Sequence, residues 1–169
     1  TLHVVIDDEI ASENQTTPET LLGIGRENFD NFAKGYYYGV FVVDARLDGN
    51  DTTGFATKTA MAIQHFDQTD EEAHIFMHEL GHAVGLGEDV YRGIDSKAVP
   101  YSKYPSAMNY NSDFDVYRYA TGANTTFDDW AYIEANFTQP PTLRLNGTAE
   151  GHVTPPEPSI RVVGAQQSR

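Results

Sequence analysis

Cysteine is absent from this chain of 169 residues. No disulfide therefore stabilises the fold, and chemistry that needs a thiol, including a cysteine that keeps an enzyme latent, is excluded within the chain. Long apolar runs are absent too, because no stretch reaches the roughly 20 apolar residues that a membrane-spanning helix requires. The length suits one domain with one sizeable core.

Basic residues are scarce. Lys and Arg together number 11 against 25 Asp and Glu, which gives a net charge of −14. Such a surface repels phosphates and anionic lipids, so we expect neither nucleic acid nor a membrane as a partner. The excess of acid and the small number of lysines (Lys34, Lys58, Lys97 and Lys103) favour adaptation to high salt over an ordinary acidic protein. Four aspartates at spacings that fit no recognised calcium loop are interpreted as a solvated acidic face: Asp113, Asp115, Asp128 and Asp129.

Glycosylation signals favour an exported protein. The chain starts at Thr1 without a visible signal peptide, as a mature or trimmed form would. Asn-x-Thr triplets suit a secreted, extracellular chain. They begin at Asn14, Asn50, Asn124, Asn136 and Asn146.

The segment from Thr69 to Gly85 is predicted to be a helix that carries the main chemical motif of the chain. Thr69 followed by Glu72 is a capping-box pattern, and Gly85 is suited to the left-handed conformation that ends a helix. His78 and His82 are four residues apart, so both lie on one face of the helix.

Two imidazoles at this spacing can bind one zinc ion and leave a position open for water. Zinc lowers the pKa of such a water to about 7. Glu79 can hydrogen-bond that water without being a ligand, and would act as the general base. His74, one turn before His78, is predicted to be an ordinary histidine on the helix surface.

A third protein ligand is expected shortly after the helix ends. At this point the sequence resembles the metzincin clan of zinc endopeptidases, whose motif is His-Glu-x-x-His-x-x-Gly-x-x-His, with Asp last in some members. His78, Glu79, His82 and Gly85 match it. Glu88 occupies the place of the last ligand and departs from the pattern, but His₂Glu zinc sites exist, so we expect Glu88 to bind zinc. Asp89 is the alternative.

A second segment carries the same resemblance. Residues 104–110 read Tyr-Pro-Ser-Ala-Met-Asn-Tyr and are similar to the metzincin Met-turn, a tight turn that places a methionine beneath the zinc ligands. Met108 would be that methionine, as a packing residue and not a ligand. Tyr110 matches a tyrosine that touches zinc or stabilises the tetrahedral intermediate in some members.

The remaining patterns predict an α+β fold. Strands are expected at 2–7, 36–44, 54–57 and 59–66, with a turn at 49–51. A helix should begin at Thr17-Pro18 and run towards Lys34. A last helix, capped by Thr126, should turn an apolar stripe into the core, formed by Phe127, Trp130, Ile133 and Phe137.

The resemblance implies a metzincin-like arrangement. A twisted mixed β-sheet with two helices would form an upper subdomain at 1–85, and an irregular lower subdomain at 86–137 would hold the Met-turn and the C-terminal helix. The Pro-containing residues 138–169 would be a tail or linker, with one strand at 142–145. In the family, an edge strand pairs with extended substrate, and 54–57 is the matching stretch here. An interior strand remains the alternative for it.

Taken together, the sequence predicts a monomeric, zinc-dependent endopeptidase that acts on peptides or proteins. Two alternatives stay open. One is a zinc peptidase of another clan, with Glu134 as the distant ligand. The other is a non-catalytic extracellular binding module that holds zinc for stability, although such a module would have no need of Glu79.

Overall fold

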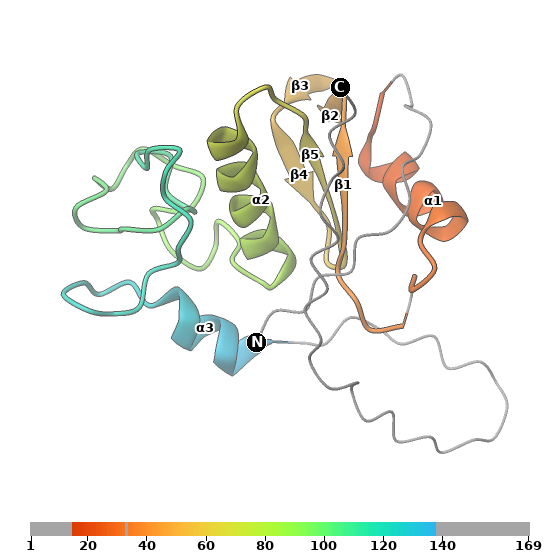
Figure 1. The fold of residues 1–169 in the computed structure, drawn as a ribbon. Coiled ribbons are helices and arrows are strands. Elements are labelled where there is room, and N and C mark those ends of the chain that lie inside the picture. The colour runs from red at the N-terminus through yellow and green to blue at the C-terminus, as the bar shows by residue number, and fades with distance from the viewer. Residues whose placement is uncertain (1–14, 33, 138–169) are drawn as a thin grey trace, which may run out of the picture.

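A mixed three-stranded sheet lies between two helices in the computed structural model, which describes residues 15–32 and 34–137 (Figure 1). The strand order is β1 (Tyr38–Val42), β5 (Ala60–Gln64), β4 (Gly54–Ala56). β5 runs parallel to β1 and antiparallel to β4, so β4 forms one edge of the sheet. The strands predicted at 36–44, 54–57 and 59–66 are confirmed.

A separate hairpin joins β1 to β4. It consists of β2 (Ala45–Leu47) and β3 (Asn50–Thr52), paired antiparallel. The turn residues between them, Asp48 and Gly49, both have positive φ (52° and 79°), as two-residue hairpin turns require. The predicted turn at 49–51 is therefore placed too late, because Asn50 already belongs to β3.

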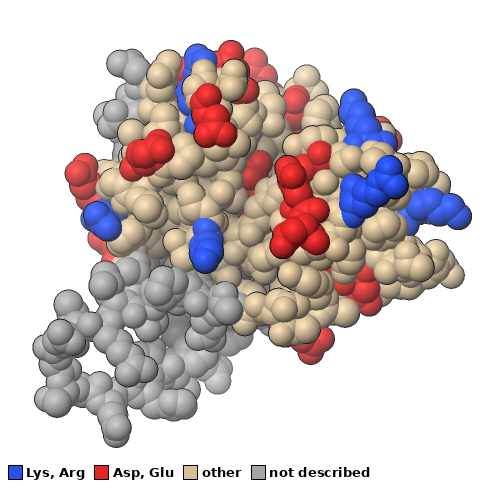
Figure 2. Space-filling view, turned by 180° about the vertical axis from the view of Figure 1, so that it is seen from behind, with Lys and Arg blue, Asp and Glu red and all other residues tan. Residues whose placement is uncertain are grey.

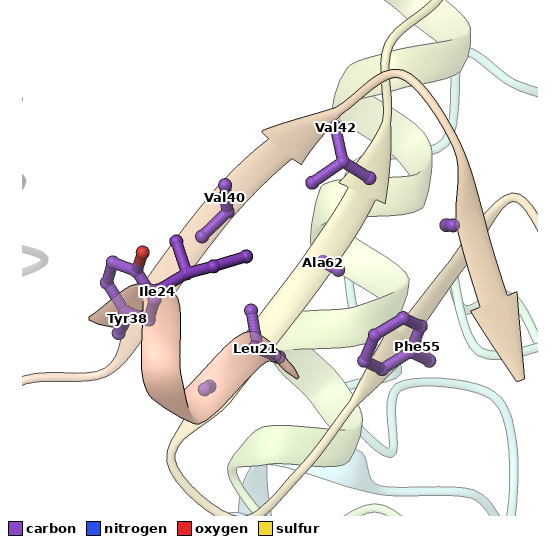
Figure 3. Packing of buried hydrophobic residues seen from close by; sticks show 9 residues of the cluster. Leu21, Ile24, Tyr38, Val40, Val42, Phe55 and Ala62 are labelled. Atoms are coloured by element: carbon purple, nitrogen blue, oxygen red, sulfur yellow. The ribbon is translucent and has the colours of Figure 1, made fainter. Parts of the chain in front are cut away.

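Helix α1 (Pro18–Asn28) covers one face of the sheet. The Thr17 hydroxyl accepts a hydrogen bond from the amide of Thr20, and Pro18 opens the helix as predicted. Figure 3 shows the apolar side chains of α1 directed at those of the strands. The helix ends before the predicted Lys34, because Phe29 takes an extended backbone conformation and packs its ring 5.0 Å from that of Tyr38.

Helix α2 (Thr69–Ala83) covers the opposite face, where Ile75 and Ala83 pack with residues of β5. Its N-cap is Gln68, without a side-chain cap bond, so the predicted capping box at Thr69 is wrong and Thr69 is already helical.

The C-terminus of α2 follows the prediction. Gly85 has φ +113°, the Leu86 amide donates to the Gly81 carbonyl at 2.9 Å, and the Gly85 amide donates to the His82 carbonyl at 3.0 Å. This pair of bonds is a Schellman motif, and the buried Leu86 supplies its apolar contact.

Beyond α2 the chain is irregular until α3 (Asp129–Asn136). The residues from Leu86 to α3 form an apolar cluster of their own. Asp128 caps α3 by accepting a hydrogen bond from the Ala131 amide, so the predicted cap at Thr126 is wrong. The predicted apolar stripe is also only partly correct. Ile133 is buried, but Trp130 is 52% exposed and Phe137 is 44% exposed, because α3 touches the cluster along a narrow side.

The described part of the chain is thus a small α+β fold with a mixed sheet and three helices. None of these helices is long and apolar enough to cross a membrane. The strands predicted at 2–7 and 142–145 and the tail at 138–169 lie outside the described residues, and the division at residue 85 stays a prediction.

Candidate metal centre

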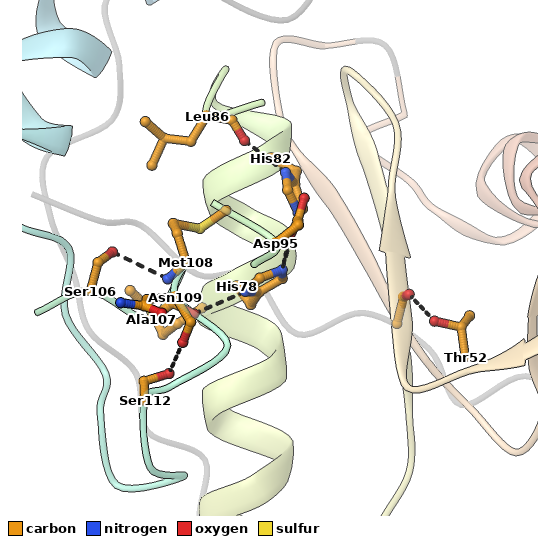
Figure 4. A network of polar contacts seen from close by, with 12 residues as sticks. Thr52, His78, His82, Leu86, Asp95, Ser106, Ala107, Met108, Asn109 and Ser112 are labelled. Carbon is orange, nitrogen blue, oxygen red and sulfur yellow. Dashed lines mark hydrogen bonds and ion pairs between the residues drawn. The ribbon is translucent and has the colours of Figure 1, made fainter. Parts of the chain in front are cut away.

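Two histidines of α2 and one aspartate from the following loop bring their ligand atoms together (Figure 4). His78 Nε2 lies 2.8 Å from Asp95 Oδ1, His82 Nε2 lies 3.2 Å from the same oxygen, and the two nitrogens are 3.1 Å apart. In the described residues this is the one group of at least three His, Asp or Glu side chains placed to bind a metal ion.

The other ring nitrogens fix the tautomers. His78 Nδ1 lies 2.9 Å from the carbonyl oxygen of Ala107, and His82 Nδ1 lies 2.7 Å from that of Leu86. A carbonyl only accepts, so each Nδ1 must carry the proton and donate. In a neutral imidazole each Nε2 then keeps its lone pair, which is free for a metal, and in a protonated imidazole Nε2 donates a hydrogen bond to Asp95 Oδ1. Backbone carbonyls that hold the distal nitrogen are the usual second contact of metal-binding histidines.

Three unprotonated donors around one point repel one another unless a proton or a metal cation lies between them. Tetrahedral zinc ligands lie about 3.3 Å apart, and the three atoms here are separated by 2.8, 3.1 and 3.2 Å. Two neutral imidazoles and one carboxylate are also a donor set that suits a borderline-soft dication. The residues therefore fit zinc in both spacing and chemistry.

The charges within the group affect one another. Burial of His82 lowers its pKa, but the carboxylate of Asp95 outweighs burial and the net pKa is raised. Burial of Asp95 works in the other direction, yet hydrogen bonds from His78 and His82 hold the pKa of Asp95 well below its usual range. Asp95 is thus a carboxylate over the whole physiological pH range.

The third member of the group is Asp95 and not Glu88 or Asp89. Both of those residues are exposed, in a turn closed by a hydrogen bond from the Val90 amide to the Gly87 carbonyl. The chain reaches the histidines only thirteen residues after His82. The physical reason is that Leu86 enters the core, so the loop must make a further turn before it returns.

Little in the sequence identifies Asp95 beforehand. Its backbone has φ 50°, a left-handed conformation that Asp tolerates better than most residues, and its amide donates to the Met108 carbonyl at 3.1 Å. The one local indication that the chain is tightly packed just before Asp95 is Gly93, where a side chain would collide with the ring of Tyr104.

Glu79 lies beside the group and is only 6% exposed. Burial raises its pKa to about 7, while the two histidines work in the opposite direction. The side chain is pressed against the edge strand: a Cβ added to Gly54 of β4 would lie 2.8 Å from Glu79 Oε1. A carboxyl group with a pKa near neutrality, next to the candidate metal centre, suits proton transfer.

Tyr110 and Met108 also lie at the site. The ring of Tyr110 stacks on that of His78, with centroids 5.6 Å apart and planes at 24°, and is 53% exposed. Partial burial, with a contribution from Asp95, raises the pKa of Tyr110 to about 12, so its hydroxyl is a proton donor at neutral pH. Met108 is fully buried, and its sulfur lies directly against Gly81 between the two histidines.

Two residues differ from their predicted surface placement. His74 is buried, with Nδ1 2.9 Å from the Val116 carbonyl, and burial lowers its pKa. Asp129 is fully buried and hydrogen-bonded, so it is not part of a solvated acidic face. Figure 2 shows acidic side chains spread over one face of the molecule, but Asp129 contributes nothing to the surface.

No protein-family model, curated protein or solved structure matches this chain. The resemblance to the metzincin clan therefore depends on the residues of the chain itself. Glu134, the distant ligand of the alternative zinc-peptidase clan, is not in the candidate group.

Proposed function

We propose that this chain is a zinc-dependent endopeptidase in which His78, His82 and Asp95 bind the metal and Glu79 is the general base. The observation that carries the proposal is the convergence of two imidazole nitrogens and one carboxylate oxygen beside a buried carboxyl group. A site that only stored zinc would not need Glu79. Burying this carboxyl group costs free energy, which a general base at the site would account for.

A zinc ion bound by these residues would polarise a peptide carbonyl and lower the pKa of a water molecule in its open position. With such an ion bound, Glu79 would accept a proton from the attacking water and pass it to the leaving amine. The charge of the ion would lower the pKa of Glu79 and favour its ionised form. The Tyr110 hydroxyl would donate a hydrogen bond to the carbonyl oxygen of the substrate.

Strand β4 is the proposed place for the substrate backbone. The Thr53 carbonyl accepts from the Gln64 amide and the Thr57 amide donates to the Ala60 carbonyl, so these alternate positions bond towards β5. By the antiparallel pattern, the backbone groups of Gly54 and Ala56 point away from β5, where the Gly54 carbonyl accepts a hydrogen bond from the Thr52 hydroxyl at 2.8 Å that a substrate amide would have to replace. An extended peptide that adds to this edge would pass next to Glu79, which touches Gly54.

Membership of the metzincin clan is part of the proposal and not a finding. The contact of Met108 with Gly81 supports it. The ligand spacing is unusual, since Asp95 is thirteen residues after His82 where the metzincin motif has six. The secreted location, the monomeric state and the adaptation to salt also remain predictions from the sequence.

The decisive test substitutes Glu79. Glu79→Gln keeps the shape of the side chain but removes the base, so zinc content should be unchanged while kcat for casein or a broad peptide library falls by about 10² to 10⁴. Glu71→Gln, on the first turn of the same helix, is the matched control and should keep wild-type kcat. Normal turnover by Glu79→Gln would exclude Glu79 as the base. Zinc-loaded wild type that cleaves nothing would favour the binding-module alternative.

The ligand set has its own test. Asp95→Ala should reduce the zinc content of purified protein to a small fraction of wild type, whereas Glu88→Ala and Glu134→Ala should leave it near one ion per chain, because only Asp95 joins the two histidines. Metal analysis after dialysis against a weak chelator measures this. Loss of zinc from Glu88→Ala, with retention by Asp95→Ala, would reverse the assignment.

A further inference from the structure

The turn at residues 106–109 contacts two of the three proposed ligands. The Ala107 carbonyl accepts the hydrogen bond from His78 Nδ1 at 2.9 Å, and the Met108 carbonyl accepts from the Asp95 amide at 3.1 Å. Any displacement of this turn therefore moves His78 and Asp95 together. Among the described residues the turn lies outside the helices and strands, so side-chain contacts contribute to its position.

Asp129, the first residue of α3, supplies that anchor. Its Oδ2 accepts hydrogen bonds from the Ser106 hydroxyl at 2.6 Å and from the Ala120 amide at 2.9 Å, and its Oδ1 accepts from the Tyr104 hydroxyl at 2.9 Å. The side chain is fully buried. Tyr104 and Ser106 come from the turn and the residues that lead into it, so one carboxylate links both to α3.

Ser106 transmits the constraint. Its hydroxyl donates to Asp129 and also accepts a hydrogen bond from the Met108 amide at 3.2 Å. The Ala107 amide is held separately by the Arg118 carbonyl at 2.8 Å. The path from Asp129 to a proposed ligand is therefore short: Asp129, Ser106, the Ala107–Met108 peptides, then His78 and Asp95.

We propose that Asp129 is a positioning residue for the metal centre, because it fixes the turn whose two carbonyls orient His78 and Asp95. The inference rests on the proposed metal site but not on peptidase activity. A buried carboxylate with three hydrogen-bond donors is rigid, and residues that orient metal ligands from behind typically change metal affinity by about 10-fold to 100-fold when substituted. Asp129 never touches metal or substrate in this role.

The alternative is that Asp129 serves fold stability alone. The two roles separate when metal affinity is measured on protein that is folded without metal. Asp129→Asn is a mild substitution: its amide oxygen still accepts from the Ala120 amide and the Ser106 hydroxyl, but these bonds lose the strength that the charge of the carboxylate gives them. Its NH₂ group faces Tyr104, which must rotate its hydroxyl to accept. Asp128→Asn is the matched control, since Asn retains the helix cap that Asp128 provides to the Ala131 amide.

The experiment titrates the full metal-free chain with Co²⁺, followed by visible absorption, and then displaces Co²⁺ with Zn²⁺. Circular dichroism in chelator first confirms that each variant is folded. We expect Asp129→Asn to bind Co²⁺ about 10-fold to 100-fold more weakly, with altered absorption bands, and Asp128→Asn to match wild type. Wild-type affinity and bands in folded Asp129→Asn overturn the proposal, even if that variant melts at a lower temperature.

Ser106→Ala provides the second variant if Asp129→Asn does not fold. It removes the hydroxyl between Asp129 and the Met108 amide and should weaken Co²⁺ binding in the same direction. Unchanged affinity overturns the proposal. Failure of the peptidase assignment looks different, because wild type would then bind Co²⁺ and Asp129→Asn would bind it weakly while neither cleaves peptide.

Discussion

At the scale of single residues, the state of Glu79 is set by burial. In the metal-free protein, burial raises its pKa from 4.5 to about 7. Between these values the folded protein holds a proton that the unfolded chain has released. The contribution of Glu79 to stability is therefore present at low pH and lost as the pH rises towards 7 and above.

Glu79→Gln should remove this dependence. In chelator, the free energy of unfolding of the variant relative to wild type should rise by about 2 to 3 kcal/mol between pH 4 and pH 8, because the amide has no charge to bury. Urea unfolding at a series of pH values measures it. The interaction between Asp95 and His82 is present in both proteins, whereas the part of the raised His82 pKa that Glu79 causes is lost in the variant.

Relief of the general charge repulsion is the competing explanation. The chain has a net charge of −14, so loss of any carboxylate reduces repulsion. Glu71→Gln removes the same charge from the same helix at a half-exposed position. A pH-dependent gain of equal size in Glu71→Gln would show that burial of Glu79 is not the cause.

At the scale of elements, the packing of α2 on the 106–109 turn depends on a glycine. A Cβ at Gly81 would overlap the sulfur of Met108 and lie 3.2 Å from the ring of Tyr119, and both of these side chains are buried. Gly81→Ala should therefore destabilise the protein by about 1 to 3 kcal/mol, despite the better helix propensity of alanine.

Gly23 of α1 is the matched control, because no atom lies within 4 Å of a Cβ placed there. Gly23→Ala should stabilise by about 0.5 to 1 kcal/mol. Thermal and urea unfolding of the metal-free proteins compare the two helical glycines. Equal stabilisation by both substitutions would mean that Met108 does not limit the space for a side chain at Gly81.

The edge strand β4 meets the proposed base at Gly54. A Cβ there would lie 2.8 Å from Glu79 Oε1 and 2.9 Å from Ile75 Cγ2, so Gly54→Ala must shift Glu79. We expect kcat to fall by about 10-fold to 100-fold with zinc content unchanged, since small displacements of a catalytic group are costly. Gly39→Ala in β1, where the nearest contact is an ordinary 3.5 Å to Met61 Cγ, should keep wild-type kcat. If Gly54→Ala and Gly39→Ala have the same kcat, the contact between β4 and Glu79 does not matter for turnover.

The elements that follow from local rules could be predicted from the sequence, and those set by distant side chains could not. The start of α1 at Pro18, the run of α2 towards Gly85 and strands β1, β4 and β5 each depend on residues inside them. Asp95 reaches the histidines through a loop that Asn109 holds from a distance, by donating to the Val99 and Tyr104 carbonyls at 3.0 and 2.9 Å. No periodicity encodes such contacts.

At the scale of the whole molecule, α2 lies between two cores of different character. On one side its apolar residues pack on a sheet whose backbone is paired. On the other side it contacts an apolar cluster formed largely by the irregular residues 86–128, where hydrogen bonds are local and side-chain mediated. The proposed ligands join these halves, since His78 and His82 come from α2 and Asp95 comes from the irregular side.

Removal of the metal should therefore increase local opening of the irregular segment around Asp95 more than that of the sheet. A ligand that binds only the native arrangement stabilises the segments whose opening breaks the site. Hydrogen exchange in chelator should be faster than in zinc for amides between residues 93 and 111, including that of Asp95, which donates to Met108. Amides of β1 and β5 that are paired within the sheet should exchange at unchanged rates while the protein stays folded, because their partners lie in the sheet itself. Equal acceleration in the sheet would instead mean that the two halves open as one cooperative unit, and that a bound metal would stabilise the global fold and not the Asp95 loop in particular.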